Sequence, residues 1–210
     1  MAKRLSLSDK AYSIIKENIV NLTFPPGMIL TEVKLAEELN MSRNPIRSAI
    51  KHLQAEGLIV TDFHKAMMVR EITEDDIREI YELREIIETK AFKTIFETNQ
   101  HEAYSYKLEE AVIKMCAAAE DVYQWEVADT KIHMIIVSVL ENERINKIYE
   151  QNLAESIRMG LYTVKNGIVM QQTNDNLRKM IKYMRDGDYE NSFKILMEDH
   201  FTLALDRLLN

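Results

Sequence analysis

Four polar residues cluster at the start of one predicted helix, and their types suit recognition of DNA. Ser42, Arg43, Asn44 and Arg47 open the segment 42–56, in which apolar residues recur at helical spacing. A helix that enters the major groove reads base edges with its first turns, and arginine can pair with guanine or with phosphate. Arg43 and Arg47 are four residues apart and therefore share a face. The alternative is that both are solvated charges on an exposed helix.

A second set of residues has types that could bind a metal or a small acid. Asp129 and His133 are four residues apart on one predicted helix, and His200 lies on the last one. A carboxylate and two imidazoles facing one core could bind a divalent cation such as zinc. Arg84 sits in an apolar stripe, where it needs a carboxylate partner from a ligand or from a residue such as Glu88. The plainer alternatives are a core histidine satisfied by aspartate and an internal Arg84–Glu88 ion pair.

The elements that would carry the first set form a winged helix-turn-helix. Helical periodicity predicts helices over 9–22, 33–40 and 42–56, the last one capped by Ser42 and followed by Gly57. Two β-prone runs, 58–61 and 67–70, indicate a two-stranded wing. Its tip holds His64 and Lys65, which could touch phosphate or the minor groove. We expect residues 1–72 to be a DNA-binding domain.

The rest of the chain is predicted to be helical almost throughout. Thr73 begins this part as a helix cap, and connections are indicated near 99–101, 141–143, 166–167 and 186–188. Residues 71–75 would be the linker, and residues 73–210 an antiparallel all-helical bundle of six to seven helices. The fold class is therefore mainly α, with the bundle expected to bind an effector and to dimerise.

Charge and composition agree with two modules in a cytoplasmic protein. Residues 1–72 hold 10 Lys and Arg against 8 Asp and Glu, whereas residues 73–210 hold 17 against 26, giving the net charge of −7. The basic part suits nucleic acid and the acidic part suits another partner. Apolar runs are too short for a membrane span, and Cys116, the single cysteine, allows no internal disulfide. We expect a cytoplasmic location and no membrane partner.

The segment around the first set resembles the GntR family of bacterial regulators. PPGMILTEVKLAEELNMSRNPIRSAIKHLQAEGLI is similar to that family's proline-glycine, Leu-Ala-Glu, Ser-Arg-x-Pro-Val-Arg and Leu-x-x-x-Gly-Leu signature. The resemblance implies that Ser42, Arg43, Asn44 and Arg47 contact operator DNA. It also implies a homodimer on a pseudo-palindromic site. Ala66 stands where the family commonly has glycine.

Residues 77–204 look like the FCD ligand-binding domain of the FadR-like members of that family. The resemblance rests on Leu83-Arg84-Glu88, Asp129-x-x-x-His133, Asn142 and Met197-x-x-His200. It implies a metal held by one Asp and three His beside a small carboxylate, with Arg84, Asp129, His133 and His200 at the effector site. Leu177 occupies the position of the third histidine, with Asn174 and Asn176 nearby as weak substitutes. The interval from Asp188 to His200 is one residue longer than the family pattern.

These observations predict a transcription regulator that responds to a ligand. We expect it to repress rather than activate, and we do not expect it to be an enzyme. Its partners would be operator DNA and a small organic acid, with a divalent metal, zinc by preference, as a cofactor. One alternative is a DNA-binding regulator with neither effector nor metal. Another is a metal-dependent hydrolase using Asp129, His133 and His200, although the sequence lacks the His-Glu-x-x-His motif.

Overall fold

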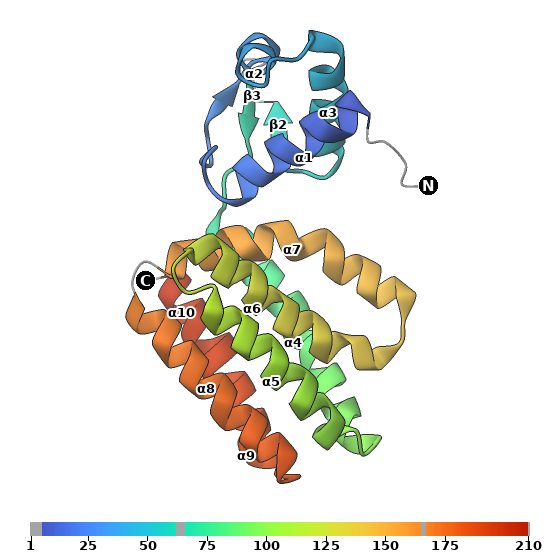
Figure 1. The fold of residues 1–210 in the computed structure, drawn as a ribbon, viewed down its shortest axis with the longest axis vertical. Coiled ribbons are helices and arrows are strands. Elements are labelled where there is room, and N and C mark those ends of the chain that lie inside the picture. Colours follow the sequence, from blue (N-terminus) through green and yellow to red (C-terminus); the bar gives the residue numbers. More distant parts are fainter. Residues whose placement is uncertain (1–5, 62–65, 165–166, 210) are drawn as a thin grey trace. The chain divides into compact units, whose positions relative to one another are not determined.

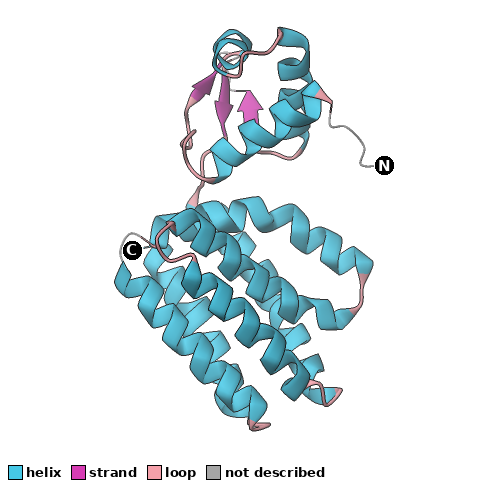
Figure 2. Cartoon of the chain, in the orientation of Figure 1, coloured by secondary structure: helices cyan, strands magenta, loops and turns pink. Residues whose placement is uncertain are grey.

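The chain divides into two compact units, residues 1–72 and 73–210, which are described separately (Figure 1). The structure is a computed structural model that describes residues 6–61, 66–164 and 167–209. Figure 2 shows that the described part is mostly helical, with its strands confined to the first unit. The elements are α1 (Leu7–Val20), β1 (Ile29–Leu30), α2 (Glu32–Glu38), α3 (Arg43–Ala55), β2 (Ile59–Thr61), β3 (Met67–Val69), α4 (Glu74–Glu97), α5 (His101–Ala117), α6 (Val122–Val137), η1 (Ser138–Leu140), α7 (Glu143–Thr163), α8 (Gly167–Arg185), α9 (Tyr189–Ile195), η2 (Leu196–Thr202) and α10 (Leu203–Leu209).

The first unit is a three-helix core with a small antiparallel sheet. Helix α1 packs on α3, and α3 packs on α2, so the buried faces of the three helices meet. The sheet order is β1-β3-β2. The two-stranded prediction was therefore incomplete, because β1 adds a third strand through the pairs Ile29 with Met68 and Leu30 with Met67. Two residues are too few to show a strand's alternating pattern, so only the pairing reveals it.

Capping residues set the helix starts. Ser6 begins α1 through a capping box with Asp9, so this helix starts two residues earlier than predicted. Thr73 forms the corresponding box with Asp76 at the start of α4, which confirms the predicted cap. Gly57 follows α3 at φ +77°, a conformation that glycine tolerates and that ends the helix.

The second unit is a bundle of helices, as predicted. Helix α5 lies between α6 and α8, α6 also packs on α4 and α7, and α8 packs on α9 (Figure 1). Predicted connections fall at Asn99, at Glu141 and at Gly187, each with a positive φ. The turn at 118–121 between α5 and α6 was not predicted, because the alanines before it favour helix and only Asp121, the cap of α6, marks it.

The last helix contains a π-helical segment. Residues Leu196–Thr202 are π-helical between the α-helical turns of α9 and α10. A π turn accommodates one extra residue in a helix without breaking it. A π turn at this place is what the longer interval from Asp188 to His200, expected from the family resemblance, would require.

Candidate functional sites

The start of α3 presents its polar residues outward. Ser42, Arg43, Asn44 and Arg47 are all exposed, while the opposite face is buried. Ser42 is the N-cap residue, but within the described part of the chain its hydroxyl makes no capping hydrogen bond. The buried face consists of Pro45, Ile46, Ala49, Ile50 and Leu53. The predicted reading residues therefore share one accessible surface at a helix N-terminus, where backbone N–H groups favour an anion.

Arg47 is held by a residue that the sequence did not single out. Its Nε donates to Glu32 Oε1 at 2.8 Å, and its Nη2 donates to Glu32 Oε2 at 2.7 Å. The Arg47 hydrogen bonds, and then the charges of Arg47, Arg43 and Lys51, lower the pKa of Glu32. A basic stripe runs along the exposed face of α3, with one residue every four positions: Arg43, Arg47 and Lys51. Glu32, the first residue of α2, is close enough to these three positive charges for them to lower the pKa of its carboxyl group.

The predicted wing contacts cannot be placed. His64 and Lys65 lie outside the described residues, between Thr61 at the end of β2 and Met67 at the start of β3. Their roles therefore stay predictions.

A cavity in the bundle brings together three residues predicted for the effector site. Arg84 from α4 and Asp129 and His133 from α6 line a space of about 50 Å³. Clefts between the helices of a bundle are common ligand sites. The other lining residues are Tyr81, Trp125, Glu126, Gly160, Val164, Val169, Thr173, Ala204 and Arg207.

Glu88 is the centre of a buried network behind this cavity. The carboxylate is fully buried and accepts from Arg84 Nε at 3.0 Å, from His133 Nδ1 at 2.5 Å and from the Tyr149 hydroxyl at 2.7 Å. Burial alone would raise the pKa of Glu88, but the charges of His133 and Arg84 hold it well below its usual range. The internal partner of Arg84 is therefore Glu88, as the plainer alternative had it.

His133 lies between two carboxylates. Its Nδ1 faces Glu88, and its Nε2 is 3.4 Å from Asp129 Oδ2. Burial would lower the pKa of His133, but the Glu88 carboxylate raises it to about 9. In this arrangement the ring carries a positive charge at neutral pH.

Glu126 is a cavity residue that the sequence analysis missed. It is buried, and burial and then the Asp129 charge raise its pKa well above the usual range. Its carboxylate lies against Gly160 of α7, where an added Cβ would be 1.8 Å from Glu126 Oε1. Glu126 is three residues before Asp129, so the two residues share one face of α6. This spacing could have identified Glu126 from the sequence.

The described residues do not complete a metal site. Two zinc ligands at about 2.0–2.2 Å and tetrahedral angles are about 3.4 Å apart, so the pair His133 and Asp129 would fit one edge of such a site. Within the ranges that the structure describes, however, no group of three His, Cys, Asp or Glu could hold a metal. Leu177 is buried in the core, and Asn174 Oδ1 accepts from Trp125 Nε1 at 3.3 Å. The side chain of His200 lies outside the description.

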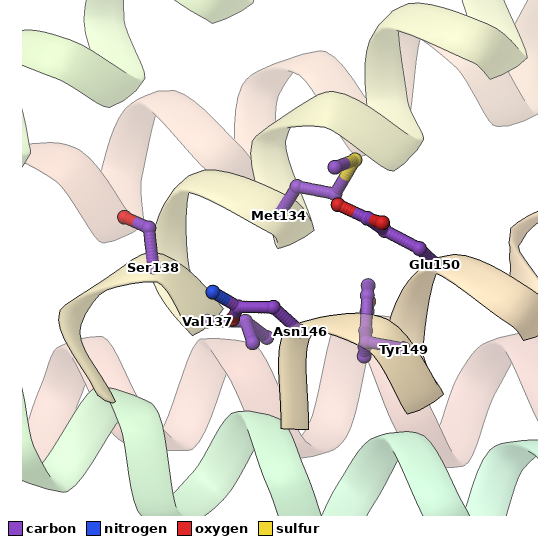
Figure 3. A pocket seen from close by; sticks show the side chains of 6 residues that line it. All are labelled: Met134, Val137, Ser138, Asn146, Tyr149 and Glu150. Carbon is purple, nitrogen blue, oxygen red and sulfur yellow. The ribbon is translucent and has the colours of Figure 1, made fainter. Parts of the chain in front are cut away.

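A second cavity adjoins the same network (Figure 3). This cavity of about 110 Å³ lies where α6 and η1 meet α7. Its lining residues are Met134, Val137, Ser138, Asn146, Tyr149 and Glu150. Tyr149 lines this space and donates to Glu88, whose other partners line the first cavity. Glu88 thus connects the two cavities through direct hydrogen bonds.

Comparisons with known proteins match both units. The family described as "Bacterial regulatory proteins, gntR family" matches residues 7–69, and the family described as "FCD domain" matches residues 79–202. An uncharacterized HTH-type transcriptional regulator of Bacillus subtilis is 28% identical over 142 residues, covering 66% of this chain and 63% of that protein. The gluconate operon transcriptional repressor of Bacillus licheniformis is 31% identical over 137 residues, covering 64% of this chain and 56% of that protein. The chain thus matches less than two thirds of either relative's length.

The fold agrees with a solved structure over its whole length. A protein from a Rhodococcus species, described as a transcriptional regulator GntR, superposes with a TM-score of 0.82 at 21% identity, covering 98% of both chains. This likeness concerns the fold alone. Among the described helices, none is long and apolar enough to cross a lipid bilayer.

Proposed function

Because the chain belongs to the GntR family of bacterial regulatory proteins and carries an FCD domain, we propose that it is a ligand-responsive transcription regulator that reads operator DNA with α3. The observation that carries this proposal is the exposed set Ser42, Arg43, Asn44 and Arg47 at the start of a helix whose other face is buried. His64 and Lys65 would add wing contacts. A bacterial regulator that binds DNA would act in the cytoplasm, so the proposal includes that location.

Binding to selected and random DNA tests this role. The operator is first selected from a randomised duplex library with the wild-type protein. Arg47→Ala should weaken binding to the selected site far more than binding to random DNA, because base contacts carry specificity and phosphate contacts do not. Lys10→Ala, which removes one exposed positive charge from α1, is the control. An equal loss on both DNAs would make Arg47 a phosphate contact instead.

We further propose that the protein acts as a homodimer on a pseudo-palindromic operator. The basis is the family resemblance described above, which implies a dimer on such a site. Three similar proteins are named operon repressors, one of them as a probable one, which favours repression over activation for this chain as well. Light scattering of the purified protein, with and without operator, measures the number of chains per complex.

The effector proposed for the first cavity is a small carboxylate. Arg84, His133 and Arg207 supply three positive charges there against the negative charge of Asp129, and the raised pKa of Glu126 favours the uncharged form of that carboxyl. An anion is therefore favoured over an amine. The cavity is smaller than the roughly 300 Å³ of common ligand sites, so binding requires it to widen. An effector that prefers the widened state would shift the protein toward it and change operator affinity.

A thermal-shift screen of small organic acids, with matched amines as controls, tests this part. An acid that binds the folded protein should raise its melting temperature, and Arg207→Ala should remove most of that rise. The same acid should change operator affinity. A binder that leaves operator affinity unchanged would contradict the sensing role, and a screen without any binder would favour a regulator that lacks an effector.

A divalent metal, with zinc favoured by an Asp–His ligand set, stays a prediction for Asp129, His133 and His200; it would bind neutral His133 and replace the proton that the ring carries in the metal-free protein. Metal analysis of the protein as purified tests it directly, since a bound zinc would be present at about one per chain. The hydrolase alternative gains nothing from the comparisons, because the matched family and the named relatives are transcriptional regulators and not enzymes.

A further inference from the structure

The contact between Glu32 and Arg47 joins the two helices of the helix-turn-helix. Thr31 caps α2 by accepting from Lys34 N at 3.2 Å, so Glu32 occupies the first, well-fixed position of that helix. A carboxylate is favourable there because the helix N-terminus carries partial positive charge. The backbone position of Glu32 is thus set by its own helix.

The pairing uses only one edge of the guanidinium group. Nε and Nη2 face the two oxygens of Glu32 at 2.8 and 2.7 Å. Arginine has five N–H donors, and among the described residues the hydrogen bonds to Glu32 use two of them, so both hydrogens of Nη1 and one of Nη2 stay available. One hydrogen of Nη1 and one of Nη2 form the end-on edge, which can pair with O6 and N7 of guanine. The Arg47 side chain is 54% exposed, so this edge is accessible.

We propose that Glu32 is a positioning residue that fixes the plane of Arg47 for reading a guanine base. This inference rests on the proposed function, in which α3 reads operator DNA. The bidentate pair already restricts the rotation of the Arg47 side chain before DNA binds. Arg47 therefore has less conformational freedom left to lose when it contacts a base. It also neutralises the charge of Arg47, so the residue is drawn less to the phosphate backbone and its contribution depends on directed hydrogen bonds.

Glu32→Ala tests the proposal, with Glu38→Ala as the matched control because it removes the same charge from an exposed site on α2. Glu32→Ala should lower affinity for the selected operator by about two- to tenfold, the cost of immobilising one long side chain on binding. The preference for guanine at the position that Arg47→Ala identifies should relax as well. Affinity for random DNA should stay the same or rise, as in Glu38→Ala. Glu32→Gln, which keeps one acceptor, should fall between wild type and Glu32→Ala.

The double variant Glu32→Ala with Arg47→Ala separates positioning from a general effect on folding. If Glu32 acts through Arg47, the double variant should bind the operator as Arg47→Ala does. Glu32→Ala binding the operator as tightly as Glu38→Ala, with unchanged base preference, would overturn the positioning role while leaving the DNA-reading role of Arg47 intact. Arg47→Ala without effect on operator binding would overturn the assignment of Arg47 to DNA and this inference with it.

Discussion

The stability of the protein should fall as pH rises from 6 to 9, because of His133. The pKa of this histidine is raised from the usual 6.5 to about 9 in the folded chain, chiefly by Glu88 against the effect of burial. Folding therefore favours the protonated ring, and its stabilising contribution is complete below pH 6.5 and lost as pH approaches 9. The rise in pKa corresponds to roughly 3 kcal/mol.

Urea unfolding of EDTA-treated protein at pH 6, 7.5 and 9 measures this contribution. The free energy of unfolding of wild type should drop over that range by about 3 kcal/mol more than that of His133→Gln, in which the titrating ring is absent. Glu126 also has a raised pKa, so it too lowers stability as pH rises. Because both proteins contain Glu126, its contribution is removed by the comparison. His52→Gln, at an exposed position of α3, controls for the loss of an imidazole. Equal slopes for wild type and His133→Gln would refute the Glu88–His133 pairing as the source.

Three further outcomes are expected. Gly160→Ala should destabilise the protein by about 1–3 kcal/mol in urea unfolding, because the new Cβ collides with Glu126. Adding Glu126→Ala should recover much of that loss, and a double variant no more stable than Gly160→Ala would contradict the collision. Tyr149→Phe should lower the free energy of unfolding by about 1–3 kcal/mol, since it removes a hydrogen-bond donor from buried Glu88. An unchanged free energy of unfolding would show that the Glu88 carboxylate does not depend on this hydrogen bond. Metal analysis of the protein as purified should find about one zinc per chain. Much less zinc, together with a melting temperature that EDTA does not change, would rule out the metal at Asp129, His133 and His200.

Local signals made helix α3 predictable. Ser42 and Gly57 bracket the segment 42–56, and the structure has α3 at Arg43–Ala55 between an N-cap and a left-handed glycine. Apolar spacing then assigned the buried face correctly. These features depend on residues only a few positions apart, which sequence patterns report well.

Contacts between distant residues were harder to predict. Glu32 pairs with Arg47 across fifteen positions, and β1 is a strand only because β3 pairs with it. The cavity was predicted in part: Arg84, Asp129 and His133 come together, yet Arg207 comes from a helix whose register includes a π turn. Periodicity alone does not determine such a register, since it assumes regular α-helix throughout.

The third strand has a mechanical consequence for DNA binding. β1 ends at Leu30, and Thr31 and Glu32 follow at once, so the ladder between β1 and β3 is tied directly to the start of α2. A force applied to β3 would pass through two backbone pairs to Glu32 and from there to Arg47. Strand β3, the start of α2 and Arg47 of α3 are therefore joined by one continuous chain of contacts. A shift of the strand on DNA would be passed along this chain to the helix that we propose reads the operator.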